Sequence, residues 1–302
     1  MTLSVGPTTP LQAAARPAAR VPRVGRRLSG RALVRRLLWH AVLIGCSVVA
    51  LVPIAYMVLT SLRPLQGALT GSLIPTHLTF KAYSYAWNTV QIWRNVINSV
   101  IITGSSVVLI VMCATLAGYA FGRLRFTGRQ LLFAVIVSAL FLPGVATLIP
   151  VYLEMKQLGL LGSRFGLVLL YVAGGIPLSI FLMRTFFEAL PAELSEAARI
   201  DGANELQVFL RIMLPLALPG IGTIAILQLV NVWNELLFAS ALLSDPNQRP
   251  LQPAATQLIG QYATNWPVLT AAMTISALPM VILYVVFQRW FVAGLAAGAV
   301  KS

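Results

Sequence analysis

The sequence predicts an all-α protein that crosses a membrane with six helices. Only 10% of its 302 residues are charged and 58% are hydrophobic, whereas a soluble domain carries about 25% charge. The apolar residues gather in runs of roughly 20 or more, the length that a helix needs to cross a bilayer. These runs do not alternate in short blocks, as the strands of a membrane barrel do. Because backbone groups in lipid must be bonded internally, each run is expected to be a helix.

The six predicted spans divide the chain into an arm, a core and a tail. The spans are residues 38–60, 96–121, 131–151, 165–185, 218–243 and 267–291. The corresponding regions are a basic, disordered arm at 1–37, a first span with its outside loop at 38–95, a permease-like core at 96–292 and a tail at 293–302. The core includes one long polar loop at 186–217.

Positive charges set the expected orientation. If the N-terminus lies in the cytoplasm, 16 of the 22 Lys and Arg residues fall on the cytoplasmic side and six fall outside. Cytoplasmic loops carry such an excess, so both termini and the loop at 186–217 are expected on the cytoplasmic side of a cell membrane. The arm at 1–37 holds eight of the arginines, and we expect it to touch anionic membrane lipid rather than nucleic acid.

Residues that could carry chemistry of their own are scarce. Two cysteines and two histidines show no metal-ligand spacing, and Cys46 and Cys113 both fall inside predicted spans. The sequence contains no Ser/His/Asp order and no Gly-rich phosphate loop with its lysine. We therefore expect no catalytic site, metal or cofactor on this chain. Its energy source would be a partner or an ion gradient.

Much of the acidic charge lies in one stretch, from Glu188 to Pro215. This stretch holds five acids and two bases, whereas the rest of the chain has three acids and 20 bases. Helices that lie on a bilayer are usually basic. An acidic loop between two apolar spans is therefore expected to project from the membrane and to serve as a docking surface.

Local signals divide this loop into two short helices. Pro191 suits the first turn of a helix, and Gly202 fits the left-handed position that ends one. Asn204, with Gln207 three residues later, has the pattern of a capping box for a second helix. Helical spacing predicts a small, mostly apolar face on the first helix and a larger apolar side on the second. These are Leu194, Ala197, Ala198 and Asp201, and Leu206, Phe209, Leu210 and Met213, respectively.

The predicted fifth span contains Glu235, the only acid well inside a span. Gln228, Asn231 and Glu235 recur at i, i+3 and i+7, which predicts a common helical face, and Trp233 and Asn234 lie beside them. Ionisable groups inside a membrane usually face a cavity or a partner. Two interpretations remain open: the cluster lines a translocation path, or it forms hydrogen bonds between helices.

The acidic loop also carries the spaced motif Glu-Ala-Ala-x3-Gly-x9-Ile-x-Leu-Pro. Its residues are Glu196, Ala197, Ala198, Gly202, Ile212, Leu214 and Pro215. This motif resembles the signature loop of permease subunits of binding-protein-dependent ABC importers. Four further segments are similar to the carbohydrate branch of that family. They are Arg199-Ile200-Asp201-Gly202-Ala203, Trp233-Asn234-Glu235, Ser244-Asp245-Pro246 and Ala297-Gly298-Ala299-Val300-Lys301.

The resemblance, which covers about residues 40–302, implies a MetI-like permease fold and a set of partners. In that family the loop is a coupling helix that fits a cleft on a cytoplasmic ATPase. The docking residues carried over are Glu196, Ala197, Ala198, Asp201, Gly202, Ile212, Leu214 and Pro215. The family's C-terminal tail also reaches the ATPases, which points to Gly298 and Lys301. The implied partners are a second permease in a heterodimer, two ATPase subunits that bind ATP and Mg, and an extracytoplasmic solute-binding protein. The implied solute is a sugar or is sugar-like.

Three other functions are weighed against this one. A permease of the same superfamily for another solute, such as a polyamine, would share the loop. A secondary transporter driven by an ion gradient would show inverted repeats and a broken, charge-lined helix, but the sequence has no clear internal repeat and the acidic loop would be unexplained. A membrane-embedded enzyme would need several catalytic groups inside the spans, where only Glu235 is available.

Overall fold

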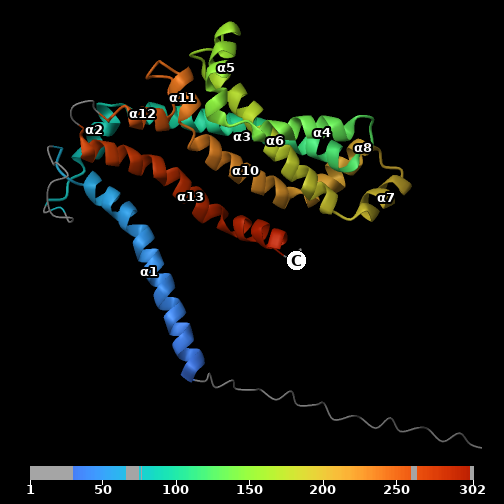
Figure 1. Ribbon diagram of the computed structural model, residues 1–302, viewed down its shortest axis with the longest axis horizontal. Coiled ribbons are helices and arrows are strands. Elements are labelled where there is room, and N and C mark those ends of the chain that lie inside the picture. Colours follow the sequence, from blue (N-terminus) through green and yellow to red (C-terminus); the bar gives the residue numbers. More distant parts are fainter. Residues whose placement is uncertain (1–29, 66–74, 76, 260–263, 300–302) are drawn as a thin grey trace, which may run out of the picture. The chain divides into compact units, whose positions relative to one another are not determined.

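The computed structural model describes residues 30–65, 75, 77–259 and 264–299, and every regular element in these ranges is a helix (Figure 1). In chain order the elements are α1 Gly30–Ser61, α2 Lys81–Asn88, α3 Ile92–Arg123, α4 Arg129–Ser138, η1 Ala139–Phe141, α5 Gly144–Gln157, α6 Arg164–Ala189, α7 Ala192–Ile200, α8 Glu205–Val208, η2 Phe209–Met213, α9 Leu214–Leu216, α10 Leu218–Trp233, α11 Leu237–Leu242, α12 Leu251–Thr256 and α13 Trp266–Ala299. The chain divides into two units, Met1–Val52 and Pro53–Ser302, and the second unit holds α2 to α13.

The first and last helices extend beyond their predicted ends. Helix α1 begins at Gly30, so the predicted disordered arm at 1–37 is wrong for residues 30–37. The Ala, Leu and Arg residues in that segment all favour a helix. Residues 1–29 lie outside the described residues. Helix α13 continues to Ala299 and includes most of the predicted tail.

Within the described residues, four helices are long and apolar enough to cross a membrane, and the number rises to six if each of two bent pairs counts as one span. The four lie in α1, α3, α6 and α13. The bent pairs are α4–η1 with α5, at 105°, and α8–α9 with α10, at 69°. In the second bent pair, the segment formed by α8, η2 and α9 is the last part of the predicted loop at 186–217.

The predicted third span, 131–151, is wrong as one straight helix. Element η1 ends at Phe141 and α5 begins at Gly144. A proline disfavours helical backbone at the residue before it, and Leu142, which precedes Pro143, is extended with φ −82° and ψ 117°. The chain therefore bends sharply at this proline.

The predicted fifth span, 218–243, is also wrong as one helix. Residues 234–236 interrupt it between α10 and α11. Glu235 lies in this break, and its carboxylate oxygens accept the backbone N–H groups of Phe238 at 2.8 Å and Ala239 at 3.0 Å. A side chain that satisfies the free N–H groups at the start of a helix stabilises that start. Glu235 therefore begins a new helix instead of continuing α10.

The contact between α3 and α6 lies at the centre of the second unit (Figure 1). A Cβ atom at Gly118 of α3 would lie 2.4 Å from Met183 Cβ of α6, and one at Gly122 would lie 3.0 Å from Phe187 Cβ. Only glycine allows the two backbones to approach this closely. Helix α10 packs against both α3 and α6, so these three helices support the loop that follows α6.

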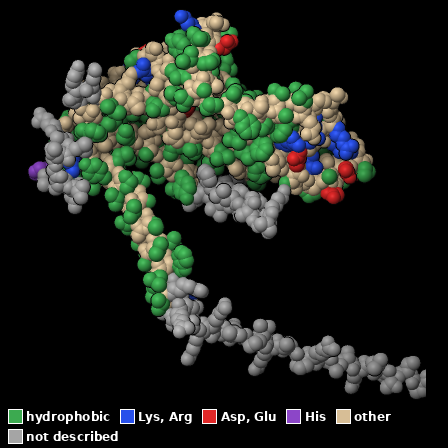
Figure 2. Space-filling model, viewed as in Figure 1, with side chains coloured by type: hydrophobic (Ala, Val, Ile, Leu, Met, Phe, Trp, Pro, Cys, Tyr) green, Lys and Arg blue, Asp and Glu red, His purple; other side chains and the backbone are tan. Residues whose placement is uncertain are grey.

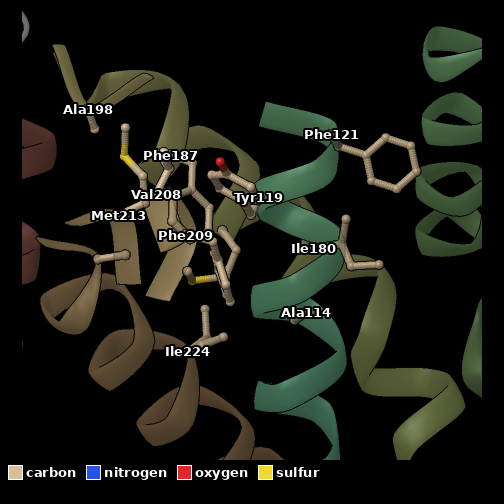
Figure 3. Packing of buried hydrophobic residues seen from close by; sticks show 12 residues of the cluster. Ala114, Tyr119, Phe121, Ile180, Phe187, Ala198, Val208, Phe209, Met213 and Ile224 are labelled. Atoms are coloured by element: carbon tan, nitrogen blue, oxygen red, sulfur yellow. The ribbon is translucent and has the colours of Figure 1, made fainter. Parts of the chain in front are cut away.

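A buried apolar cluster joins the loop to this support (Figure 3). The bundle contributes Tyr119, Phe187 and Ile224, and the loop contributes Val208 and Met213. All five side chains are buried. Because burial of apolar surface is the dominant favourable contribution to folding, this cluster fixes the loop against the ends of α3 and α6.

Candidate functional site

The acidic loop forms the two helices and the turn that its local signals predict. Helix α7 ends at Ile200, and Gly202 has the left-handed φ of 83°. Asn204 Oδ1 accepts the backbone N–H of Gln207, and Gln207 Oε1 accepts the backbone N–H of Asn204, each at 2.9 Å. This reciprocal pair is the predicted capping box. Charged side chains of both signs gather over α7 and α8 at this end of the unit (Figure 2).

The second loop helix is shorter than expected and changes its geometry. Helix α8 has four residues, and the π-helix η2 follows it directly. Phe209 and Met213 are buried, whereas Leu206 and Leu210 are exposed. The prediction of one apolar side for these four residues is therefore wrong, because the wider π-turn rotates the side chains relative to an α-helix.

The motif residues divide into an exposed group and an inward-facing group. The exposed members are Glu196, Ala197, Asp201, Gly202 and Pro215. Ala198 is only 8% exposed and belongs to the buried cluster, against which Ile212 and Leu214 also pack. The predicted outward face is wrong for Ala198, because Ser195 and Ala198, three residues apart, form the side of α7 that is buried.

Three exposed apolar residues on the loop were not predicted as docking residues. Ile200 is 86% exposed, Leu206 63% and Leu210 49%. Ile200 is the last residue of α7, directly before the turn at Gly202. The sequence did contain a signal for the exposure of Ile200, because this residue ends a predicted helix directly before an Asp-Gly turn. A partner that covers these side chains would gain their burial.

Ion pairs fasten the start of the loop and join its two helices. Glu188 Oε1 accepts from Arg184 Nε at 2.7 Å and from an Arg129 nitrogen at 3.3 Å. Arg199 Nε donates to Glu205 Oε1 at 2.8 Å. This hydrogen bond raises the pKa of the Arg199 guanidinium above its usual range, so Arg199 is charged throughout the physiological pH range.

Two predicted path residues are buried between helices. Gln228 is 3% exposed, and its Nε2 donates to the Gly175 carbonyl at 3.2 Å and to Ser179 Oγ at 2.9 Å, both in α6. Trp233 is 5% exposed, and its Nε1 donates to the Ser276 carbonyl of α13 at 3.2 Å. These contacts fit hydrogen bonding between helices, and the lining interpretation is wrong for Gln228 and Trp233.

Glu235 does not share the helical face that the spacing predicted. Helix α10 ends at Trp233, so the expected relation between Gln228 and Glu235 is wrong. Besides capping α11, Glu235 Oε2 accepts the hydroxyl of Tyr171 in α6 at 2.5 Å. This carboxylate therefore connects α11 to α6, and both of its oxygens are used within the chain.

Asn234 borders a pocket of about 390 Å³ between α10, α12 and α13. Gln252 Nε2 donates to Ser276 Oγ at 3.1 Å and to Asn234 Oδ1 at 3.4 Å. Thr256 also lines the pocket, and Asn231, one turn before Asn234, is exposed. Polar side chains inside a membrane usually face a cavity or a partner. Gln252, Thr256 and Ser276 were not predicted as site residues, because only tertiary structure brings these three helices together.

Two further predictions concern metals and the C-terminus. Among the described residues, no three His, Cys, Asp or Glu side chains are grouped as a metal site. Gly298 lies in α13, whereas Lys301 lies outside the described residues. Their contact with an ATPase stays a prediction.

Comparison with known proteins assigns the class of the chain. Residues 114–296 match the family described as "Binding-protein-dependent transport system inner membrane component". The chain belongs to this family of ABC importer permeases, and the all-α membrane fold predicted from its sequence is thereby confirmed.

Individual relatives agree with this assignment. The chain is 32% identical to the diacetylchitobiose uptake system permease protein NgcG of Streptomyces coelicolor, over 87% of this chain and 88% of the relative. It is also 32% identical to the melibiose/raffinose/stachyose import permease protein MelC of Bacillus subtilis, over 83% of this chain and 91% of the relative. A solved structure of a bacterial ABC transporter involved in the import of the acidic polysaccharide alginate matches with a TM-score of 0.75 and 28% identity, over 87% of this chain and 98% of that chain.

Proposed function

We propose that this chain is one permease subunit of an importer that moves a sugar or sugar-like solute into the cell. The observation that carries the proposal is the acidic loop, which stands on the α3–α6 support and exposes Glu196, Ala197 and the Gly202 turn. The relatives named for diacetylchitobiose and for melibiose, raffinose and stachyose support the solute class. The alginate transporter structure supports it as well.

The proposed assembly has a second permease, which makes a heterodimer, two ATPase subunits and an extracytoplasmic solute-binding protein. The ATPase subunits bind ATP and Mg, so the permease itself is not an enzyme. The excess of Lys and Arg on one side of the spans supports a cytoplasmic location for both termini and for the loop at 186–217. Gly298 and Lys301 of the tail would form a second contact with the ATPases.

Docking would rely on shape and apolar contact more than on charge. The open turn at Gly202 and the small side chain of Ala197 let another surface approach, and Ile200 offers apolar area to cover. Exposed ion pairs contribute little each, so Glu196 and Asp201 would mainly set the register of the contact. The inward-facing side of the loop would keep it in place through the apolar contacts of Ala198, Ile212 and Leu214. Pro215 lies where the chain turns back toward the membrane.

The pocket between α10, α12 and α13 is the surface of this chain best suited to the solute. The amides of Asn234 and Gln252 and the hydroxyl groups of Thr256 and Ser276 can exchange hydrogen bonds with sugar hydroxyls. Asn231 extends this polar surface by one turn of α10. The large residues of the predicted cluster, Gln228, Trp233 and Glu235, would instead keep the surrounding helices in position.

A polyamine is less well accommodated by this pocket. A polycation inside a membrane needs carboxylates to offset the loss of its hydration. None of the ten described residues that line the pocket is Asp or Glu. The nearest acid in sequence, Glu235, is occupied by Tyr171 and by the backbone of α11.

Replacement of Gly202 tests the docking role. Nothing lies within 4 Å of a Cβ built at Gly202, and its φ is 83°, so a substitution there acts through the backbone and not through a clash. Valine is β-branched and strained in this conformation, whereas asparagine tolerates it. We expect Gly202→Val to insert normally into the membrane and to lose ATP-dependent uptake, and Gly202→Asn to retain it. Unchanged uptake in Gly202→Val membrane vesicles would overturn the docking role.

A further inference from the structure

Tyr119 lies at the point where the long helix α3 meets the acidic loop (Figure 3). Its side chain is 6% exposed. The ring centroid is 4.8 Å from that of Phe209 in η2 and 5.5 Å from that of Phe187 in α6. The hydroxyl group donates to Glu205 Oε2 at 3.1 Å. A residue of the bundle thus has both an apolar and a polar contact with the loop.

Glu205 joins this tyrosine to the other loop helix. Its Oε2 accepts from Tyr119 of α3, and its Oε1 accepts from Arg199 of α7 at 2.8 Å. Glu205 itself is the first residue of α8. Three elements therefore meet at one carboxylate, and we call this set of Tyr119, Glu205 and Arg199 the Glu205 joint.

The two kinds of contact at Tyr119 constrain movement differently. Apolar packing against Phe187 and Phe209 is non-directional and tolerates small rotations. A hydrogen bond to a carboxylate is directional, so it limits the angle between α3 and α8. Outside the joint, α3 is fixed to α6 by the close approach at Gly118 and Gly122. Movement of α8 against α3 is therefore limited by the hydroxyl of Tyr119 as well as by its ring, while Arg123 of α3 holds the start of the loop by donating to the Leu190 carbonyl.

The joint is open to a partner on one side only. The side chains of Arg199 and Glu205 are 40% and 51% exposed, whereas Tyr119 is buried. A protein docked on α7 and α8 reaches the Arg199–Glu205 pair directly and reaches Tyr119 only through Glu205. This arrangement lets a contact at the loop surface act on α3 without touching it.

We propose that Tyr119 is a positioning residue that makes α3 follow the acidic loop, through its hydrogen bond to Glu205. The proposal rests on the docking of ATPase subunits at this loop. Displacement of α7 and α8 carries Glu205 with it, and the bonded hydroxyl group carries α3. When the hydroxyl group is removed, the loop stays folded on its apolar cluster and the ATPases stay docked, but α3 follows the loop less completely. ATP is then hydrolysed with less solute moved.

Tyr119→Phe tests this proposal, because it removes one oxygen atom and keeps the ring contacts. The complete transporter, with its ATPase subunits and binding protein, is reconstituted in lipid vesicles, and uptake and ATP hydrolysis are measured together. We expect the ATPases to co-purify as with the wild-type chain, and uptake per ATP to fall about tenfold, the size expected for one hydrogen bond to a charged group. Tyr152→Phe is the matched control, since Tyr152 is 37% exposed on α5 and is expected to keep the wild-type ratio.

The outcomes separate this proposal from the docking role on which it rests. A wild-type chain that binds no ATPase overturns both. A Tyr119→Phe variant with the wild-type ratio of uptake to hydrolysis overturns the positioning role alone, and so does a variant that loses its ATPases.

A double substitution gives a second, independent test. Tyr119→Phe removes the donor and Glu205→Ala removes the acceptor of one hydrogen bond, and effects of contacting partners are not additive. We expect the double variant to lose no more coupling than the more affected single variant. Losses that multiply would mean that the two residues act separately, and the proposal would then be wrong.

Discussion

Helix α3 is held at its two ends by different chemistry. Near its start, the side-chain amides of Asn95 and Asn98 donate to backbone carbonyls between Pro246 and Arg249 at 2.8 to 3.2 Å. We call these contacts the amide clamp. Near its end, Tyr119 of α3 meets the Glu205 joint, and beside it the ion pairs of Glu188 join α6 to α4. The first set is neutral and buried, and the second is ionic and partly exposed.

This difference separates a fixed end from an adjustable one. Asn95 and Asn98 are 6% and 4% exposed, so outside groups have little access to their side-chain amides. The carboxylates of Glu188 and Glu205 are 40% and 51% exposed, so a docked protein or dissolved salt can exchange with their partners. A helix that moves in response to a partner at one end needs a fixed contact at the other end. If both ends were weakly held, a displacement at one end would not be transmitted along the helix.

The largest effect is expected at the close packing of α3 against α6, which supports the whole of α3. Gly118→Ala places a Cβ atom 2.4 Å from Met183 Cβ and 3.1 Å from the Arg184 backbone nitrogen, which forces α3 away from α6. We expect a loss of about 3 kcal/mol in the free energy of unfolding, measured by thermal unfolding in detergent. Gly104→Ala on the same helix meets nothing within 4 Å and should change stability by no more than about 1 kcal/mol. Equal melting temperatures for the two variants would show that the close approach of α3 and α6 is not a rigid support.

A smaller effect is expected from opening the amide clamp. Asn98→Leu leaves the Asn247 carbonyl without the Asn98 amide as donor and removes the acceptor of Arg164, whose guanidinium lies 2.7 Å from Asn98 Oδ1. We expect a loss of about 2 kcal/mol and faster protease cleavage between residues 244 and 250, independent of salt. The exposed Asn88, whose side-chain amide donates to Ser84 Oγ at 3.2 Å, provides the control Asn88→Leu. Protection that is unchanged in Asn98→Leu would contradict a fixed end.

The smallest effect is expected at the ionic end. Glu188→Gln weakens two partly exposed ion pairs, with Arg129 and Arg184. We expect a loss of about 0.5 kcal/mol at low salt, measured again by thermal unfolding. At about 1 M salt, where charges are screened beyond roughly 3 Å, the variant and the wild type should unfold together. A loss that persists at high salt would assign Glu188 a structural role like that of the amide clamp.

The sequence predicts the loop well because its signals are local. The Asn204–Gln207 capping box and the left-handed Gly202 each depend on residues within one turn, and both are confirmed. Which side of α7 faces the bundle depends instead on the buried cluster that includes Phe187 of α6 and Met213 of η2, both outside α7. The position of Ala198 could not be read from helical spacing alone.

The polar residues of the membrane were harder to predict for the same reason. Glu235 ends the regular spacing because Tyr171, 64 residues earlier, shares its carboxylate. Asn234 belongs to a pocket whose other polar groups, Gln252 and Ser276, come from later helices. Pro143 is a helix-breaking signal within the predicted third span, but the angle of 105° between the helices on either side could not be read from the sequence.

The amide clamp also determines the order in which the protein can be completed on the ribosome. Asn95 and Asn98 are made about 150 residues before the carbonyls that they bind. At roughly 5–20 residues per second, their partners appear about 8–30 s later. Leaving two side-chain amides without hydrogen bonds in lipid for that time costs free energy. The start of α3 is therefore expected to remain at the membrane–water interface or inside the insertion machinery. The side-chain contacts at the start of α3 can therefore be completed only after the segment before α12 has been synthesised.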